Sequence, residues 1–184
     1  MRMGLFYTGR GDKGVSSIGP GKRIDKTAPE IAAAGDLDEL ISLLGLVRSR
    51  SKNKQVKKLL RAAQENLFII QANIAAEMFG GDYKAPALAA EKVKQLEREI
   101  DALEQKIKPA RGFIIPGESE EEAWLDYARA VSRRAERSVL SMHKMRPLNH
   151  TILAYLNRLS SLLFALARAS IQESGKKEEY PKYR

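Results

Sequence analysis

The segment ILAYLNRLSSLLFALARA, residues 152–169, indicates the fold class of this 184-residue chain. Apolar side chains recur every three or four positions along it, at Ile152, Leu156, Leu159, Leu163, Leu166 and Ala169. An α-helix completes a turn every ~3.6 residues, so this spacing puts them on one helical face. Pro147 precedes the segment and Gly175 follows it, as is typical of helix ends. We expect a long helix with one buried face.

Four more segments with the same period precede this one. We expect helices from about Ala28-Pro29 to Val47, from Val56 to Phe79, from about Pro86 to Ile107, and from Ser119 to beyond Val139. Ser119-Glu-Glu-Glu122 is typical of a capping box, and Gly80-Gly81 and Pro109 are expected to end the second and third helices. The predicted fold is all-α, a five-helix up-and-down bundle with a glycine-rich N-terminal loop.

The chain shows no internal repeat and no linker, so we expect one domain over residues 1–184. It divides into an N-terminal loop (1–27), the helical bundle (28–175) and a tail (176–184) that we expect to be frayed. No apolar stretch has the roughly 18 residues that a bilayer span needs, and no signal peptide precedes the bundle. We therefore expect a cytoplasmic protein without membrane contact.

Composition excludes several kinds of chemistry. The chain has no cysteine, which excludes disulfides, thiolate metal sites and cysteine nucleophiles. His143 and His150 lack the spacing of metal ligands, so no metal site made of protein side chains is predicted. The formal net charge of +9 indicates an anionic partner, but basic and acidic residues alternate along most segments. Most of this charge is interpreted as solvated helix surface, and a nucleic-acid-binding bundle is a hypothesis that rests on charge alone.

The glycine-rich start has the composition of a phosphate-binding loop. Gly9-x-Gly11-x-x-Gly14 matches the dinucleotide fingerprint, but that fingerprint works only between a strand and a helix of a βαβ unit. Glycines let backbone N–H groups converge on an anion, and hydroxyl and basic side chains add donors. These side chains are those of Thr8, Ser16, Ser17, Lys22, Arg23 and Lys26. A flexible arm explains the composition equally well.

Two later helices carry polar side chains on shared faces. Arg129, Arg133 and Glu136 have helical spacing and Arg137 adjoins them, an arrangement that suits a polyphosphate or, alternatively, an ion-paired solvated surface. In the fifth helix, Asn157, Ser161 and Arg168 share a face. There the Asn157 amide could bind a base or ribose, or form a hydrogen bond between helices.

The roles of Asp38 and Phe113 each have a structural and a functional interpretation. Gly35, Asp38, Ser42 and Gly45 form a small polar stripe on which Asp38 is either solvated or paired with an arginine of the fourth helix. Phe113 belongs to a hydrophobic loop just before that helix, and its ring is either a core plug or the wall of an apolar ligand site.

Five motifs in this order resemble the PduO-type ATP:cob(I)alamin adenosyltransferases. They are Tyr-Thr-x-x-Gly-Asp-x-Gly at 7–14, Gly-Asp-Leu-Asp-Glu-Leu at 35–40, Phe-Ile-Ile-Pro-Gly at 113–117, Ala-Arg-x-x-x-Arg-Arg-Ala-Glu-Arg at 128–137 and Leu-Asn-Arg-Leu-Ser at 156–160. The resemblance spans about residues 5 to 171. It implies a ferritin-like, cobalamin adenosyltransferase-like bundle that forms a homotrimer with active sites at subunit interfaces.

The resemblance also implies a reaction and its residues. The 5′-deoxyadenosyl group of ATP passes to cob(I)alamin, triphosphate is released, Mg²⁺ accompanies ATP, and a corrinoid reductase supplies cob(I)alamin from cob(II)alamin. Arg129 would pair with Asp38 as the catalytic pair, and Phe113 would displace the lower axial base of the corrinoid. ATP would be bound by Thr8, Gly9, Arg10, Gly11, Asp12, Gly14, Ser16, Ser17, Lys26, Arg133, Arg134, Glu136, Arg137 and Asn157.

The chain departs from the family pattern at a few positions. Arg10 follows Gly9, Glu118 replaces a glycine, Asp126 replaces a histidine, and Ser161 replaces an aspartate. Glu118 and Ser161 motivate an alternative, a trimer that binds ATP or adenosylcobalamin and senses or delivers it without turnover. Formation of adenosylcobalamin distinguishes the enzyme from this binding protein.

Overall fold

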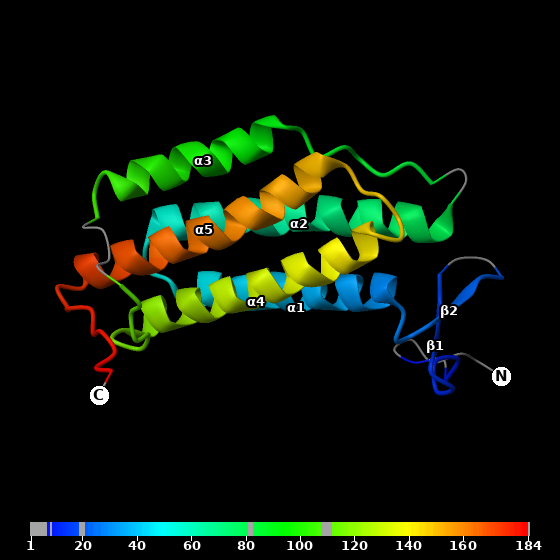
Figure 1. Cartoon of the computed structure of the whole chain (residues 1–184), viewed down its shortest axis with the longest axis horizontal. Coiled ribbons are helices and arrows are strands. Elements are labelled where there is room, and N and C mark those ends of the chain that lie inside the picture. The colour runs from blue at the N-terminus through cyan, green and yellow to red at the C-terminus, as the bar shows by residue number, and fades with distance from the viewer. Residues whose placement is uncertain (1–6, 8, 19–20, 81–82, 108–111, 184) are drawn as a thin grey trace.

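The computed structural model describes residues 7, 9–18, 21–80, 83–107 and 112–183 of the chain. Its five helices alternate in direction, as expected for an up-and-down bundle (Figure 1). They are α1 (Pro29–Arg50), α2 (Lys54–Phe79), α3 (Glu91–Glu104), α4 (Glu120–His143) and α5 (His150–Glu173). Two short antiparallel strands, β1 (Val15–Ser17) and β2 (Arg23–Asp25), form a hairpin before α1, where we had expected only loop.

Local signals begin α1 and α4 and end α2 as predicted. Pro29 starts α1, where its missing N–H has no intrahelical partner to lose. The side chain of Asn53 accepts from the N–H groups of Gln55 and Val56 at the start of α2, and Gly80, with φ +64°, follows its end. The hydroxyl of Ser119 accepts from the N–H of Glu122 and caps α4.

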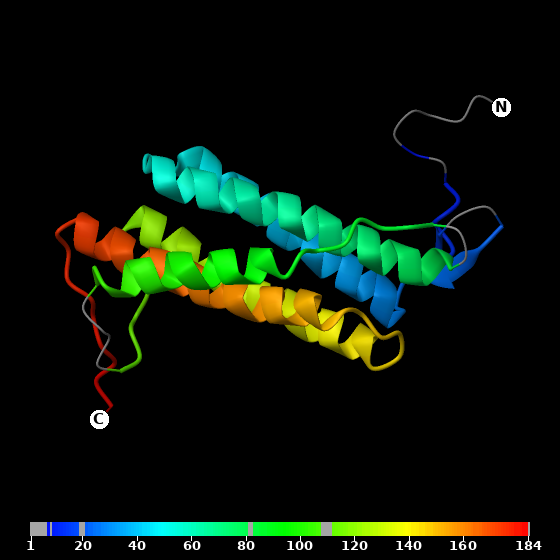
Figure 2. The ribbon, with the colours of Figure 1, turned by 90° about the horizontal axis from the view of Figure 1, so that it is seen from above.

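The core lies between α1, α2, α4 and α5, and α3 packs mainly against α5 (Figures 1 and 2). The predicted stripe of α5 is buried except for Ala169, which is partly exposed. Tyr155 is fully buried, and Asn66 donates a hydrogen bond to its hydroxyl at 3.0 Å. Burial raises the pKa of Tyr155 to about 12, so this phenol stays neutral.

By length and composition alone, α5 is long and apolar enough to cross a membrane. The core helices of soluble proteins can meet the same two criteria. In the structure 61% of its most apolar window is buried inside the bundle. The apolar character of α5 is therefore explained by packing against α3 and α4.

Two predicted segments differ in the structure. The third helix begins at Glu91 rather than near Pro86, and Ala90 is exposed rather than inside. Asn73 donates to the carbonyl of Pro86 at 2.9 Å, and Leu88 is buried outside any helix, so residues 83–89 follow the bundle without forming a turn of helix. Propensity favoured a longer helix, and these tertiary contacts prevail.

The C-terminal tail, which we expected to be frayed, forms specific contacts within its described residues, 176–183. The N–H of Ile115 donates to the carbonyl of Glu179 at 2.9 Å and forms an isolated antiparallel bridge. Lys176 donates to the carbonyl of Glu118. The tail therefore packs against the loop that carries Phe113, a contact between segments about 60 residues apart that no local pattern reveals.

Candidate active site

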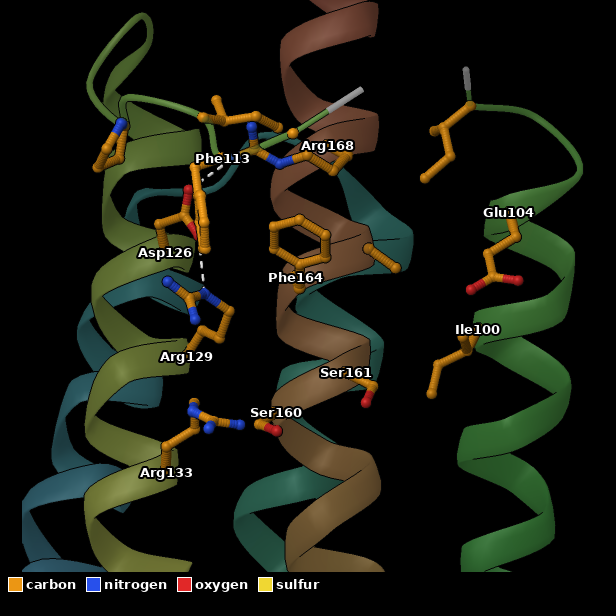
Figure 3. A pocket seen from close by; sticks show the side chains of 15 residues that line it. Ile100, Glu104, Phe113, Asp126, Arg129, Arg133, Ser160, Ser161, Phe164 and Arg168 are labelled. Atoms are coloured by element: carbon orange, nitrogen blue, oxygen red, sulfur yellow. Dashed lines mark hydrogen bonds and ion pairs between the residues drawn. The ribbon is translucent and has the colours of Figure 1, made fainter. Parts of the chain in front are cut away.

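A cavity of about 1040 Å³ opens at the end of the bundle where α4 begins (Figure 3). One wall is basic, with Arg129 and Arg133 of α4 and Arg168 of α5. The other surfaces are largely apolar and come from Ile100 of α3, Phe164 of α5 and the loop at 112–116. A pocket that is apolar on one side and cationic on the other suits a ligand with a large flat apolar part and an anionic part.

Arg129 and Arg133 reach this pocket because they lie one turn apart on the same face of α4. The Nε of Arg129 donates to Asp126 Oδ1 at 3.0 Å, and the guanidinium carbon of Arg129 lies 5.7 Å from the centroid of the Phe164 ring. Arg133 is exposed on the pocket wall. Two residues of the predicted arginine face, Arg129 and Arg133, therefore line a pocket, whereas Arg137 is exposed and does not line it.

A nearly buried ionic cluster forms part of this wall. Arg168, only 3% exposed, donates to Glu122 at 3.0 Å, to Asp126 at 2.5 Å and to Glu178 of the tail at 3.3 Å. Burial raises the pKa of the Asp126 carboxyl, and its contact with Glu122 adds to the rise. Burial also opposes ionisation of Glu122, but the N–H of Gly117 and the Arg168 guanidinium hold its pKa below the usual value.

Aromatic rings complete the pocket. Phe113 is 81% exposed, so its ring is not a core plug, and it lies on the loop at the pocket mouth (Figure 3). Phe164 packs between two guanidinium groups. The centroid of its ring lies 5.7 Å from the guanidinium carbon of Arg129 and 5.1 Å from that of Arg168. The structure thus favours the interpretation of Phe113 as a wall of an apolar ligand site.

The predicted polar residues of α5 separate into two groups. Ser161 and Arg168 line the pocket, whereas the amide of Asn157 donates to Glu136 of α4 at 3.1 Å. Asn157 also accepts from Arg158 at 2.8 Å. Asn157 and Glu136, which the family resemblance assigns to one nucleotide site, therefore lie together beside the arginine face. The two side chains form a hydrogen bond between α4 and α5.

Two other predicted residues lie apart from the pocket. Arg134 turns toward α1, where it pairs with Glu39 and lies 3.7 Å from Asp36. Asp38 is exposed on α1 and forms no ion pair with Arg129 in the described part of the chain. Within one chain, Arg129 pairs with Asp126 instead, so the predicted Asp38–Arg129 pair is not made there.

The glycine-rich loop is folded into a turn followed by the hairpin. Gly9 and Gly14 have φ of +67° and +76°, conformations that favour glycine. The N–H of Lys26 donates to the carbonyl of Gly14 at 2.9 Å, and the Lys26 amine lies so close to Gly11 that a side chain there would meet it at 3.0 Å. The loop therefore brings the predicted glycines close to the Lys26 amine, while Thr8 lies outside the described residues.

This hairpin and the pocket lie toward opposite ends of the bundle (Figure 1). Lys22 donates to the carbonyl of Phe79 at 2.6 Å, which holds the hairpin beside the end of α2. Arg129 lies in the first half of α4 and Arg133 near its middle, and the ten residues from Arg133 to His143 carry the helix about 15 Å further toward the hairpin end. A single chain does not bring the two predicted halves of the nucleotide site together.

Sequence reasoning missed Phe164 as a pocket residue and read Glu122 only as part of a helix cap. Phe164 could have been found from the sequence, because it is a large aromatic residue three positions after Ser161 that lies outside the apolar stripe of its helix. The role of Glu122 depends on Arg168, 46 positions away, and had no local signal. Among the described residues no group of three or more His, Cys, Asp or Glu side chains could hold a metal ion.

Comparisons with known proteins give a consistent result. A family model described as cobalamin adenosyltransferase matches residues 6–170. The chain is 38% identical over 164 residues to the corrinoid adenosyltransferase PduO of Citrobacter freundii, covering 89% of this chain and 49% of that protein. It is 36% identical over 174 residues to a corrinoid adenosyltransferase of Bacillus subtilis, covering 92% and 88% respectively. The chain thus spans about half the length of the PduO relatives, including that of Salmonella typhimurium, and most of the Bacillus protein.

A solved structure is also similar throughout. It is a phenylalanine-to-alanine variant of a PduO-type ATP:corrinoid adenosyltransferase from Lactobacillus reuteri, complexed with cobalamin and ATP. The two structures superpose with a TM-score of 0.85 at 28% identity, over 97% of this chain and 99% of that one.

Proposed function

This chain belongs to the cobalamin adenosyltransferase family, and from that premise we propose that it transfers the 5′-deoxyadenosyl group of ATP to cob(I)alamin. In this reaction the electron pair of Co(I) attacks C5′ of ATP. A cobalt–carbon bond forms, the bond between C5′ and its oxygen breaks, and triphosphate leaves with the bonding electrons. The products are adenosylcobalamin and triphosphate.

The observation that carries this proposal is the mixed character of the 1040 Å³ pocket. We assign the flat corrin ring to its apolar side, and Phe113 at its mouth is proposed to displace the lower axial base. Its basic side supplies Arg129 and Arg133 to oppose charge that grows on the leaving triphosphate. Because Co(I) is itself the nucleophile, the protein has to align the reactants and stabilise charge rather than supply a nucleophilic side chain.

We assign ATP to the glycine-rich turn and the arginine helix. Gly14 and Gly9 provide the loop conformation, and Lys26 lies over Gly11 as a cation for the phosphates. The proposed site contains Thr8, Gly9, Arg10, Gly11, Asp12, Gly14, Ser16, Ser17, Lys26, Arg133, Arg134, Glu136, Arg137 and Asn157. Mg²⁺ is proposed to bind through the phosphates of ATP.

The separation of the two halves supports a homotrimer with active sites between subunits. The turn of one subunit would meet the pocket of its neighbour, and the exposed Asp38 of one subunit would reach Arg129 of the next. The proposal also includes a reductase that supplies cob(I)alamin. The need for ATP and for a strongly reduced cobalt supports a cytoplasmic site of action.

An anaerobic assay tests the function. Purified protein is mixed with Mg-ATP and chemically reduced cobalamin, and the corrinoid absorption spectrum is followed for the appearance of adenosylcobalamin. We expect ATP-dependent formation of the product with release of triphosphate. Tight binding of ATP or adenosylcobalamin without product would overturn the enzyme assignment and identify a binding protein.

A further inference from the structure

The Asp126 carboxylate joins the buried interior of the bundle to the pocket wall. It is 7% exposed and accepts from two arginines on two helices, Arg129 Nε of α4 at 3.0 Å and an Arg168 terminal nitrogen of α5 at 2.5 Å (Figure 3). Of these arginines only Arg129 has a substantially exposed side chain, at 35%. The carboxylate therefore connects a buried cation to one that faces the pocket.

The position of Asp126 is fixed by the groups behind it. Arg168 also donates to Glu122 and Glu178, and Glu122 accepts from the N–H groups of Gly117 and Glu118 at 3.0 and 3.1 Å. Arg168 is shared by all three carboxylates, and its removal would leave the buried carboxylates of Glu122 and Asp126 without their common cation. Asp126 thus presents its carboxylate to Arg129 from a rigid support.

Asp126 engages only one edge of the Arg129 guanidinium. Within the described residues the hydrogen bond of Arg129 runs through Nε, while its two terminal nitrogens make none. The Phe164 ring lies against the same guanidinium and restricts it further. A guanidinium fixed at one edge keeps a pair of donors directed outward, and such donors stabilise a transition state best when they are already in place.

We propose that Asp126 and Arg168 are positioning residues, which hold Arg129 so that its terminal nitrogens face the leaving triphosphate and the neighbouring subunit's carboxylate. The inference rests on the proposed adenosyl transfer and deepens it. Asp126 and Arg168 also line the pocket, but they are only 7% and 3% exposed, and their terminal polar atoms bond within the ionic cluster or to Arg129. They therefore act on the reaction from a nearly buried position. Arg168 acts on the reaction through Asp126, and Asp126 acts through Arg129.

A double-mutant cycle tests this dependence. The anaerobic assay is run at saturating Mg-ATP and cob(I)alamin on the wild-type chain, Asp126→Asn, Arg129→Ala and the double variant. Asparagine keeps the size of the side chain but removes its charge. We expect Asp126→Asn to lower kcat about tenfold in the wild-type background and less than about twofold when Arg129 is already alanine, because coupled residues are not additive. In a separate titration of Mg-ATP, the KM for ATP should change less than about threefold in Asp126→Asn, because phosphate-binding residues remain.

Controls separate positioning from loss of structure. Circular dichroism and unfolding midpoints are measured for every variant. Glu120→Gln removes an exposed carboxylate of α4 whose one ion pair among the described residues is with Arg50. Glu120→Gln should keep wild-type kcat. If Asp126→Asn does not fold, Arg168→Lys replaces it in the cycle, since lysine keeps the charge but loses the planar fork. The same coupling to Arg129 is expected.

Two results overturn the inference. One is an equal loss in both backgrounds, which means that Asp126 acts on the fold and not through Arg129. The other is an unchanged kcat in Asp126→Asn while the wild type is active. A wild-type chain that forms no adenosylcobalamin has a different meaning, because it overturns the proposed function and this inference with it.

Discussion

Arg133 lies on the pocket wall one helical turn from Arg129 and forms no ion pair within the described residues. We predict that Arg133→Ala raises the KM for ATP and lowers kcat, each roughly tenfold, because a charge-assisted hydrogen bond to phosphate is lost before and during transfer. Steady-state kinetics in the anaerobic assay measure both constants. The matched control is Arg61→Ala, which removes an exposed arginine of α2 that pairs with Glu65. Unchanged constants in Arg133→Ala would remove α4 from the nucleotide site.

Phe113 is the exposed aromatic residue at the pocket mouth. We predict that Phe113→Ala leaves ATP affinity nearly unchanged and slows the reaction from cob(II)alamin at least about tenfold more than the reaction from cob(I)alamin. Loss of the axial base makes Co(II) easier to reduce, and the ring is proposed to displace that base. Cob(I)alamin already lacks the base, so its alkylation depends less on the ring.

The comparison of the two starting states checks the role of Phe113. Rates are measured once with chemically reduced cob(I)alamin and once with cob(II)alamin and a reductant. Phe68→Ala on α2 is the control, because Phe68 is also an exposed aromatic side chain, at 57%, and lies outside the pocket. Equal losses from both states would show that Phe113 only packs the loop.

The first turn of α4 determines where the arginine face begins. The Ser119 hydroxyl accepts from the Glu122 N–H at 3.3 Å, so it satisfies one of the four N–H groups that a helix start leaves without partners. We predict that Ser119→Ala lowers the free energy of unfolding by about 1 kcal/mol, a usual value for loss of an N-cap. Urea denaturation measures this as a lower midpoint with an unchanged slope.

Ser141→Ala is the control for the cap, because Ser141 is an exposed serine near the other end of α4. Its replacement should change stability by less than about 0.5 kcal/mol, as is usual for surface positions. A loss in Ser119→Ala no larger than this would mean that the Glu122 side chain, bonded to Gly117 and Glu118, organises the helix start without the serine.

The hairpin and the pocket occupy opposite ends of one chain, so subunits can complement one another if they share sites. We predict that Lys26→Ala and Arg133→Ala chains, each impaired alone, regain activity when they are co-expressed and purified together. In a trimer of random composition, about a quarter of the interfaces would join an intact turn to an intact pocket. Activity near that fraction of the wild type is expected, with light scattering used to check the trimer mass.

Two controls accompany the complementation. Each variant is co-expressed with a differently tagged copy of itself, which should stay at the activity of the single variant. A mixed preparation that contains both chains in one trimer but stays inactive would show that each chain completes its own site. A monomeric mass in solution would contradict the trimer directly.

Much of the fold follows from local chemistry. Three signals act within a few residues and can therefore be recognised in the sequence. They are the 3.6-residue period of α5, Pro29 at the start of α1 and the Ser119 cap of α4. The motifs likewise identified Arg129, Arg133 and Phe113, which the structure brings to one pocket. The start of α3 was placed five residues early, because the path of residues 83–89 depends on Asn73 and on burial of Leu88.

Only the tertiary structure decided which way the charged side chains turn. Neighbouring arginines at 133 and 134 point to different elements, one to the pocket and one to α1, because α4 is packed on both sides. Asp126 meets Arg168 across 42 positions, and the tail meets the loop of Phe113 across about 60. Such pairings depend on how helices rotate and dock, which is set by burial over the whole bundle and has no local period. The sequence therefore specified the helices and the reactive residues, whereas packing selected the partners that hold those residues in place.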